Sequence, residues 1–166
     1  MEMLDIYAKA EIGKSLAGIN LGEKLEIFLP YVDQKVDGKK VGWNIDIRIN
    51  NEGILFYEWP KSYGGGYSIF INDPKLELLF TNKGTLCHIM ASEGYKGELI
   101  DGVKIGDKLI NIKHPLVLDD QEDVHYLSDG QGGVIEGIYF VAGGFEVGEY
   151  PNDVVEEVKV YDYNLV

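Results

Sequence analysis

Apolar and polar residues alternate along much of this chain, and this period of two predicts half-buried β-strands. Residues 41–49 show the pattern most clearly, with tryptophan and isoleucine at alternate positions and polar residues between them. Segments rich in glycine and asparagine, at residues 50–53, 82–84 and 130–133, are typical of hairpin turns. The predicted strands are residues 41–49, 54–59, 67–71, 76–81, 85–91, 124–127, 134–141, 145–147 and 154–161.

Two other stretches have a helical spacing. Apolar residues recur every three or four positions in residues 21–29 and again in residues 105–116. Pro30 and Pro115 interrupt these stretches at similar depths, so both helices are expected to be short. Residues 1–12 also carry apolar residues at helical spacing, and we interpret them as a leading helix.

One sequence motif occurs twice. Residues 18–25 read GINLGEKL and residues 102–109 read GVKIGDKL, and each copy precedes predicted strands. Such internal similarity predicts one structural unit used twice. We therefore expect an α+β fold of two tandem copies of a short helix plus antiparallel meander, residues 1–96 with the leading helix and residues 97–166. Their sheets are expected to pack or merge into one compact body.

Charge is the unusual bulk property of this chain. Twenty-eight acidic residues against 15 basic residues give a formal net charge of −13, while the hydrophobic content of 45% is ordinary. A field of this sign repels nucleic acid and anionic membranes and favours a basic protein partner. The alternative is that the acidity only keeps the chain in solution.

The chain carries few signs of catalysis. Its single cysteine, Cys87, excludes an internal disulfide and indicates a reducing compartment, and no signal peptide is recognisable, so we expect a cytoplasmic protein. Cys87 and His88 are neighbours on a predicted strand and therefore face opposite ways. His114 and His125 remain as possible acid–base groups. We expect no catalytic residues, no enzyme activity and no cofactor.

An acidic segment combines Asp119, Asp120, Glu122 and Asp123 with the nearby Tyr126. Its spacing does not match a calcium-binding loop and it lacks the glycine of that loop, so we expect no metal site. Two interpretations remain: a solvated acidic loop, or a loop that pairs with lysine and arginine of a partner.

An aromatic, glycine-rich segment spans residues 56–67. Trp59, Tyr63 and Tyr67 lie at the tip of the predicted hairpin, where rigid aromatic side chains beside glycine favour an interface. The alternative is a hairpin that packs on its own sheet. The sequence does not decide between them.

Two family resemblances follow from these features. The doubled motif with its meander resembles the tandem module of β-lactamase-inhibitor-protein-like folds, which implies the architecture. The acidity, the acidic segment and the missing catalytic motifs resemble the immunity proteins of bacterial polymorphic-toxin systems, including contact-dependent inhibition and nuclease bacteriocins. That resemblance implies tight one-to-one binding to a cognate toxin domain, often a nuclease.

The leading hypothesis is a non-catalytic binding protein that neutralises a basic toxin domain by covering its functional surface. Carboxylates of the acidic segment and of the C-terminal region would pair with the partner's basic residues, and Trp59, Tyr63 and Tyr126 would be the buried anchors. One alternative is an enzyme or small-ligand protein that uses a cavity between the two units, with His125 and a carboxylate. Another is a module that binds by strand addition at a sheet edge.

Overall fold

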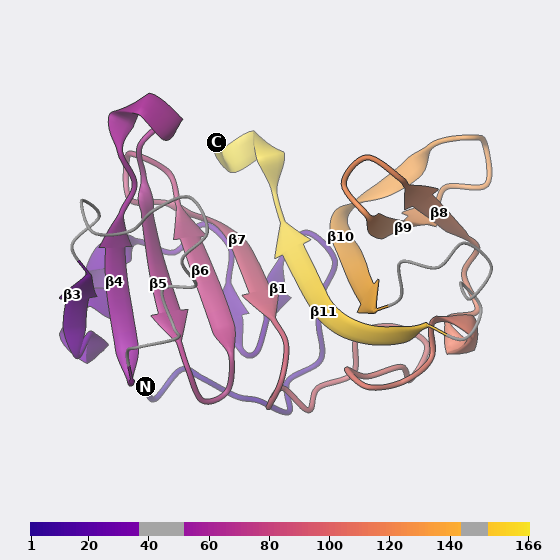
Figure 1. The fold of residues 1–166 in the computed structure, drawn as a ribbon, viewed down its shortest axis with the longest axis horizontal. Coiled ribbons are helices and arrows are strands. Elements are labelled where there is room, and N and C mark those ends of the chain that lie inside the picture. The colour runs from indigo at the N-terminus through magenta and orange to yellow at the C-terminus, as the bar shows by residue number, and fades with distance from the viewer. Residues whose placement is uncertain (37–51, 144–152) are drawn as a thin grey trace.

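The computed structural model describes residues 1–36, 52–143 and 153–166 (Figure 1). Nine strands form one sheet in the order β3-β4-β5-β6-β7-β11-β10-β9-β8, and β1 and β2 form a separate hairpin. Among the described strands of the large sheet, β3 and β4 alone pair in parallel, and the other pairs are antiparallel. The strands are β1 (Ser15–Leu16), β2 (Ile19–Asn20), β3 (Gln34–Val36), β4 (Ile54–Glu58), β5 (Tyr67–Ile71), β6 (Leu76–Phe80), β7 (Leu86–Ala91), β8 (Leu116–Asp119), β9 (Val124–Ser128), β10 (Val134–Gly143) and β11 (Val154–Tyr161).

The helices are small, so the fold is mostly β. Those in the described residues are α1 (Leu25–Phe28) and the 3-10 turns η1 (Leu29–Tyr31), η3 (Lys61–Tyr63), η4 (Leu109–Asn111) and η6 (Tyr163–Leu165). The α+β prediction therefore gave the helices too much weight. None of the helices described here has the length and apolar character that crossing a bilayer requires.

The leading helix predicted for residues 1–12 is wrong. This segment consists of turns: two backbone hydrogen bonds within it, from Leu4 to Met1 and from Ala8 to Asp5, close single turns, and others connect it to distant parts of the chain. The Asp5 amide donates to the Ala17 carbonyl at 2.9 Å, and the Ala10 amide donates to the Glu98 carbonyl at 2.8 Å. Nucleating a short helix costs free energy, and this segment forms tertiary hydrogen bonds instead.

Most of the strand predictions are confirmed. The predicted strands at 67–71 and 154–161 coincide with β5 and β11, and those for β4, β6, β7, β9 and β10 agree within two residues. The sequence does not predict the short strands β1, β2 and β3, and it does not predict β8, because the helical spacing of residues 105–116 includes the first residue of that strand. The predicted strands at 41–49 and 145–147 lie outside the described residues.

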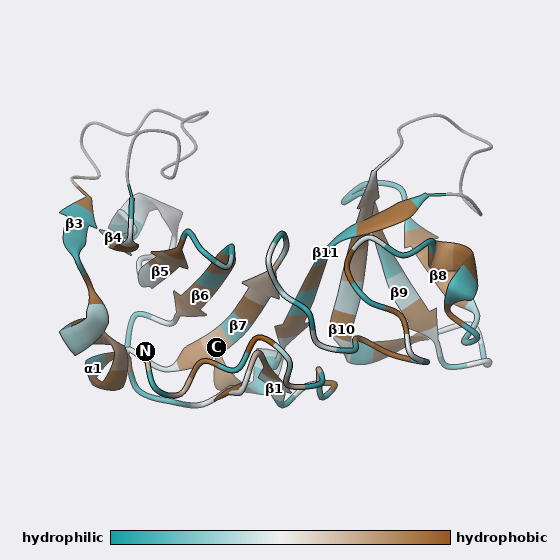
Figure 2. Cartoon of the chain, turned by 90° about the horizontal axis from the view of Figure 1, so that it is seen from below, coloured by the Kyte–Doolittle hydropathy of each residue, from teal (hydrophilic) through white to brown (hydrophobic). Residues whose placement is uncertain are grey.

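One face of the large sheet forms the core. Strand register places a row of apolar side chains side by side across six strands, all of them buried: Phe56, Ile69, Leu78, Ile89, Val160 and Ile138. The N-terminal segment, β1 and α1 lie on this side of the sheet (Figure 2), and Leu16 and Phe28 join the same cluster. Each large aliphatic side chain buried here contributes about 1.5–3 kcal/mol of transfer free energy.

The first copy of the doubled motif docks against β7 through backbone hydrogen bonds. Ala17 and Gly18 form a left-handed turn, with φ of 53° and 79°, and Gly22 follows with φ of 86°. The Gly22 amide donates to the Leu86 carbonyl at 2.8 Å, and the Leu86 amide donates to the Glu23 carbonyl at 2.9 Å. The Leu25 amide donates to the Gly84 carbonyl.

The second copy repeats these bonds against β11. Asp101 and Gly102 form the turn with φ of 54° and 83°. The amides of Gly106 and Leu109 donate to the carbonyls of Val155 and Asp153, and the Val155 amide donates to the Asp107 carbonyl, each at 2.8 Å. Because β7 and β11 are paired neighbours, the two copies hold equivalent positions on adjacent strands.

Replacing Gly22 or Gly106 by alanine tests this equivalence. Both glycines have a positive φ, and an added Cβ would meet nothing within 4 Å, so backbone strain alone should cost about 1 kcal/mol in each variant. Gly137→Ala should cost more, about 2 kcal/mol or above, because its Cβ would also lie 2.7 Å from the Gly13 nitrogen. Urea unfolding measures all three; clearly unequal losses at Gly22 and Gly106 would contradict the equivalence.

Candidate functional site

The opposite face of the large sheet carries a mixture of aromatic, charged and apolar side chains. Register places one row of them side by side across six strands: Phe70, Glu77, Met90, Lys159, Tyr139 and Tyr126. All except Phe70 are half-buried. An antiparallel sheet commonly packs one face on the core and leaves the other to solvent or a partner.

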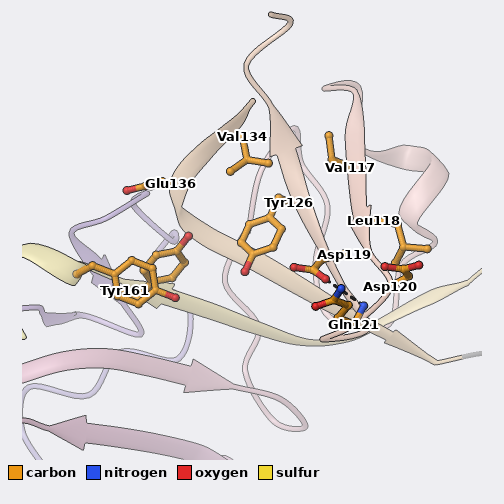
Figure 3. Close-up of a pocket in the computed structure, with 10 residues that line it drawn as sticks. Val117, Leu118, Asp119, Asp120, Gln121, Tyr126, Val134, Glu136 and Tyr161 are labelled. Carbon is orange, nitrogen blue, oxygen red and sulfur yellow. Dashed lines mark hydrogen bonds between the residues drawn. The ribbon is translucent and has the colours of Figure 1, made fainter. Parts of the chain in front are cut away.

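An open pocket of about 540 Å³ lies where this face meets β8, β9 and β10 (Figure 3). Three tyrosines and three carboxylates dominate its lining: Tyr126, Tyr161, Tyr163, Asp119, Asp120 and Glu136. Val117, Leu118 and Val134 add an exposed apolar rim. Figure 3 shows Asp119 beside Tyr126, with Glu136 across the pocket on the Tyr161 side.

The tyrosines form a continuous chain of ring contacts. The ring centroids of Tyr126 and Tyr139 lie 5.5 Å apart, those of Tyr139 and Tyr161 5.9 Å, and those of Tyr161 and Tyr163 4.5 Å. Such aromatic pairs contribute free energy to stability beyond that of the surface they bury, and they favour particular orientations of the rings. The pocket therefore has a preorganised aromatic lining that continues into the open sheet face.

Tyr126, Tyr139 and Tyr161 stay neutral at physiological pH. Burial raises the pKa of Tyr126 to about 12, and nearby tyrosines and Asp119 add to the effect. Burial likewise raises the pKa of Tyr139 to about 12 and raises that of Tyr161, with carboxylates contributing in both cases. The negative charge of the pocket thus comes from its carboxylates, while the hydroxyl groups stay available as donors and acceptors.

The structure brings only part of the predicted acidic segment into the pocket. Asp119 ends β8, and its Oδ1 accepts hydrogen bonds from the backbone amides of Gln121 at 3.1 Å and Glu122 at 3.3 Å, which shapes the turn. Asp120 lines the pocket. The side chains of Glu122 and Asp123 are exposed outside it.

The sequence did not predict three of the residues that line the pocket: Glu136, Tyr161 and Tyr163. The alternation of β11 contained part of the signal, because it puts Tyr161 on the face opposite the core. Only the order of the strands shows that this face of β11 lies beside β10 and near Tyr126.

The aromatic hairpin packs on its own sheet. The Trp59 indole N–H donates to the Ser68 hydroxyl at 2.8 Å, and the Trp59 ring makes an edge contact with Tyr57 at 4.7 Å. Tyr67 stacks on Phe56 at 5.7 Å. Neither Trp59 nor Tyr67 lines the pocket with Asp119 and Asp120. The backbone of Tyr63 lies in η3, and the structure does not describe its side chain.

The cysteine and histidine side chains do not assemble into a catalytic pair in the described part of the chain. The Cys87 thiol donates to the Leu79 carbonyl at 3.3 Å, and burial raises its pKa. His125 lies in the core-face register beside Phe140, is 3% exposed and lines neither described pocket. His114 Nδ1 lies 3.3 Å from Asp101 at the surface. Among the described residues, no group of three His, Cys, Asp or Glu is placed to hold a metal ion.

Comparisons with protein families, with curated proteins and with solved structures find no match to this chain. The resemblances noted from the sequence therefore gain no support from relatives. Function has to be argued from the geometry of the open face and its pocket.

His88 lies at the edge of the tyrosine chain in an unusual environment. Its ring packs against Tyr161 at 6.0 Å and Tyr163 at 5.7 Å, and both ring nitrogens are buried without a hydrogen-bond partner. Burial, and then the charge of Lys159, lower its pKa from 6.5 to about 4. The folded chain therefore keeps this imidazole neutral through the weakly acidic range.

We expect the free energy of unfolding to decrease as the pH falls from about 7 to 4. The unfolded chain protonates His88 near pH 6.5 and the folded chain only near pH 4, so stability present above pH 6.5 is lost as the pH falls through this window. The loss is about 2 kcal/mol after allowance for partial exposure. Urea unfolding of His88→Leu should show a flatter pH dependence of the free energy of unfolding than wild type; equal slopes in the two proteins would contradict the assignment.

Proposed function

We propose that this chain is a non-catalytic binding protein that neutralises a basic protein partner by covering its functional surface. The observation that carries the proposal is the meeting of Asp119 and Asp120 with a chain of tyrosines at one open pocket. An acidic rim with an aromatic centre is the chemistry that a strongly basic protein surface complements.

Electrostatics supports a basic partner. The chain has a net charge of −13, and no lysine or arginine is among the residues that line the pocket. Long-range attraction would accelerate encounter with a cationic surface, and the same field would repel nucleic acid and anionic membranes. Among basic proteins, a nuclease has to hold phosphates with lysine and arginine at its active cleft. An acidic inhibitor would compete for those same residues.

The tyrosines support slow dissociation. Tyr126, Tyr139, Tyr161 and Tyr163 hold one another in place, so ordering them on binding would cost little entropy. Tyrosine is enriched among the residues that dominate binding energy because it buries a large ring and keeps a polar group. Charge would thus set the association rate, and the aromatic contacts the dissociation rate.

The two-unit interpretation of the chain belongs to this proposal. We interpret residues 1–96 and 97–166 as tandem copies whose meanders merge at β7 and β11, supported by the equivalent backbone hydrogen bonds of the two motif copies. This arrangement provides a broad, rigid sheet for a one-to-one complex. It agrees with the resemblance to toxin-neutralising immunity proteins, and the free thiol of Cys87 is consistent with action in the cytoplasm.

The rival hypothesis, an enzyme built around His125 in a cavity between the units, has no observation that favours it. His125 lies on the core face, whereas the pocket opens on the opposite face beside Tyr126. Adjacent residues of a strand point to opposite sides, so the two side chains cannot share a site there.

A growth-rescue experiment tests the proposal. Products of genes that neighbour this one are expressed singly in a bacterial host, and we expect one to arrest growth and wild-type chain to relieve the arrest. The double variant Asp120→Lys/Glu136→Lys should lose the rescue and weaken binding to that product at least tenfold, because both exposed carboxylates line the pocket.

Glu2→Lys/Glu26→Lys is the matched control. It makes the same change in net charge at two exposed residues that do not line the pocket, and it should retain the rescue. If no neighbouring product is toxic, the neutralising function is wrong. If both double variants rescue equally, the pocket is not the binding surface.

A further inference from the structure

We propose that the pocket seats a single guanidinium group, the side chain of an arginine that the partner presents. This inference rests on the proposed function, because it specifies which chemical group of a basic partner the site recognises. The argument uses the charge of the pocket, the orientation of its rings and the character of its rim.

The pocket presents carboxylates that have no cation of their own. Within the described chain, Asp120 and Glu136 make no ion pair or hydrogen bond, and Asp119 uses one carboxylate oxygen for its turn. Figure 3 places Asp119 and Glu136 on different sides of the pocket. A cation between them would be contacted from two directions, and a group with several spread donors can bond to both carboxylates.

The aromatic lining favours a flat cation. The half-buried Tyr126 and the exposed Tyr163 present aromatic surface in the pocket, and the buried Tyr161 packs against Tyr163. Guanidinium is planar, weakly hydrated and has five donors, and it stacks on aromatic faces. An ammonium group has only three donors and a tighter hydration shell.

The same row of tyrosines already accepts a cation in the folded chain. Lys159 Nζ lies 5.5 Å from the centroid of the Tyr139 ring, which itself contacts Tyr126 and Tyr161. The pocket end of this row has the carboxylates but no lysine. A cation that binds at the pocket end would contact the tyrosine row as Lys159 contacts it at Tyr139.

The rim suits the rest of an arginine side chain. Val117, Leu118 and Val134 are 39%, 49% and 38% exposed and line the same pocket. The methylene stem of a bound arginine would cover them, as long cationic side chains do on apolar surfaces. Removing these groups from water adds affinity that a bare inorganic cation would not gain.

Titration of the isotope-labelled full chain with N-acetyl-arginine amide tests the inference by NMR. We expect chemical-shift changes confined to residues of the pocket, with a millimolar dissociation constant as befits one side chain. N-acetyl-lysine amide should bind at least threefold more weakly. N-acetyl-citrulline amide, which has nearly the same shape without the charge, should produce no saturable change.

The exposed pair Asp120→Asn/Glu136→Gln removes the charge at nearly constant shape and should weaken arginine binding at least fivefold. The matched pair Glu2→Gln/Glu26→Gln should bind like wild type, and the unperturbed spectrum of each variant checks that it folds. Tyr126→Leu should also weaken binding while retaining the carboxylates. Equal responses to arginine and citrulline, or shifts outside the pocket, would overturn the inference.

The small-probe readout separates this inference from the proposed function, because it involves no partner. Rescue of growth without arginine binding would overturn the guanidinium seat and leave the neutralising function standing. Arginine binding without any toxic neighbour would leave the seat standing and overturn the function, indicating a receptor for a free guanidinium compound. Stronger binding of spermidine than of the arginine probe would overturn the preference for guanidinium.

Discussion

The antiparallel pairing of β7 with β11 is the interaction on which the rest of the structure depends. It joins strands from the two halves of the chain, and on the core side it places Ile89 beside Val160, so that one apolar row continues across both halves. On the other side it places His88 beside Tyr161. Without this pairing each meander would expose an edge strand, and the tyrosine chain would lose its contact with β7.

Alternate residues of the same strands form the two faces of the sheet. One face is buried in the core and the other is open. The core face is mostly apolar because burying a polar group without a partner costs free energy. The open face has no such restriction, and tyrosine suits it because a ring can pack on its neighbours while its hydroxyl reaches water. The contacts between Tyr126, Tyr139 and Tyr161 therefore make the open face rigid without making it apolar.

The sequence predicted most strands because alternation is a local signal. It failed at residues 1–12, where the apolar spacing resembles that of a helix but the backbone forms single turns and bonds to Ala17, Lys96 and Glu98. It also could not assign Trp59: the indole found a partner in Ser68 on the next strand, a contact that depends on hairpin register. Half of the candidate site was found through Asp119, Asp120 and Tyr126, because charge and aromatic character can be recognised without a fold.

The sequence by itself determined most of the longer strands and the doubled turn motif, since each depends on residues close together in the chain, and it determined the acidity, which is a matter of composition. Tertiary structure decided which side chains meet. Tyr161 and Glu136 reach the pocket of Asp119 only because β11 lies between β7 and β10, with β9 and β8 beyond β10. Strand order depends on pairing between distant segments, and no local pattern encodes it.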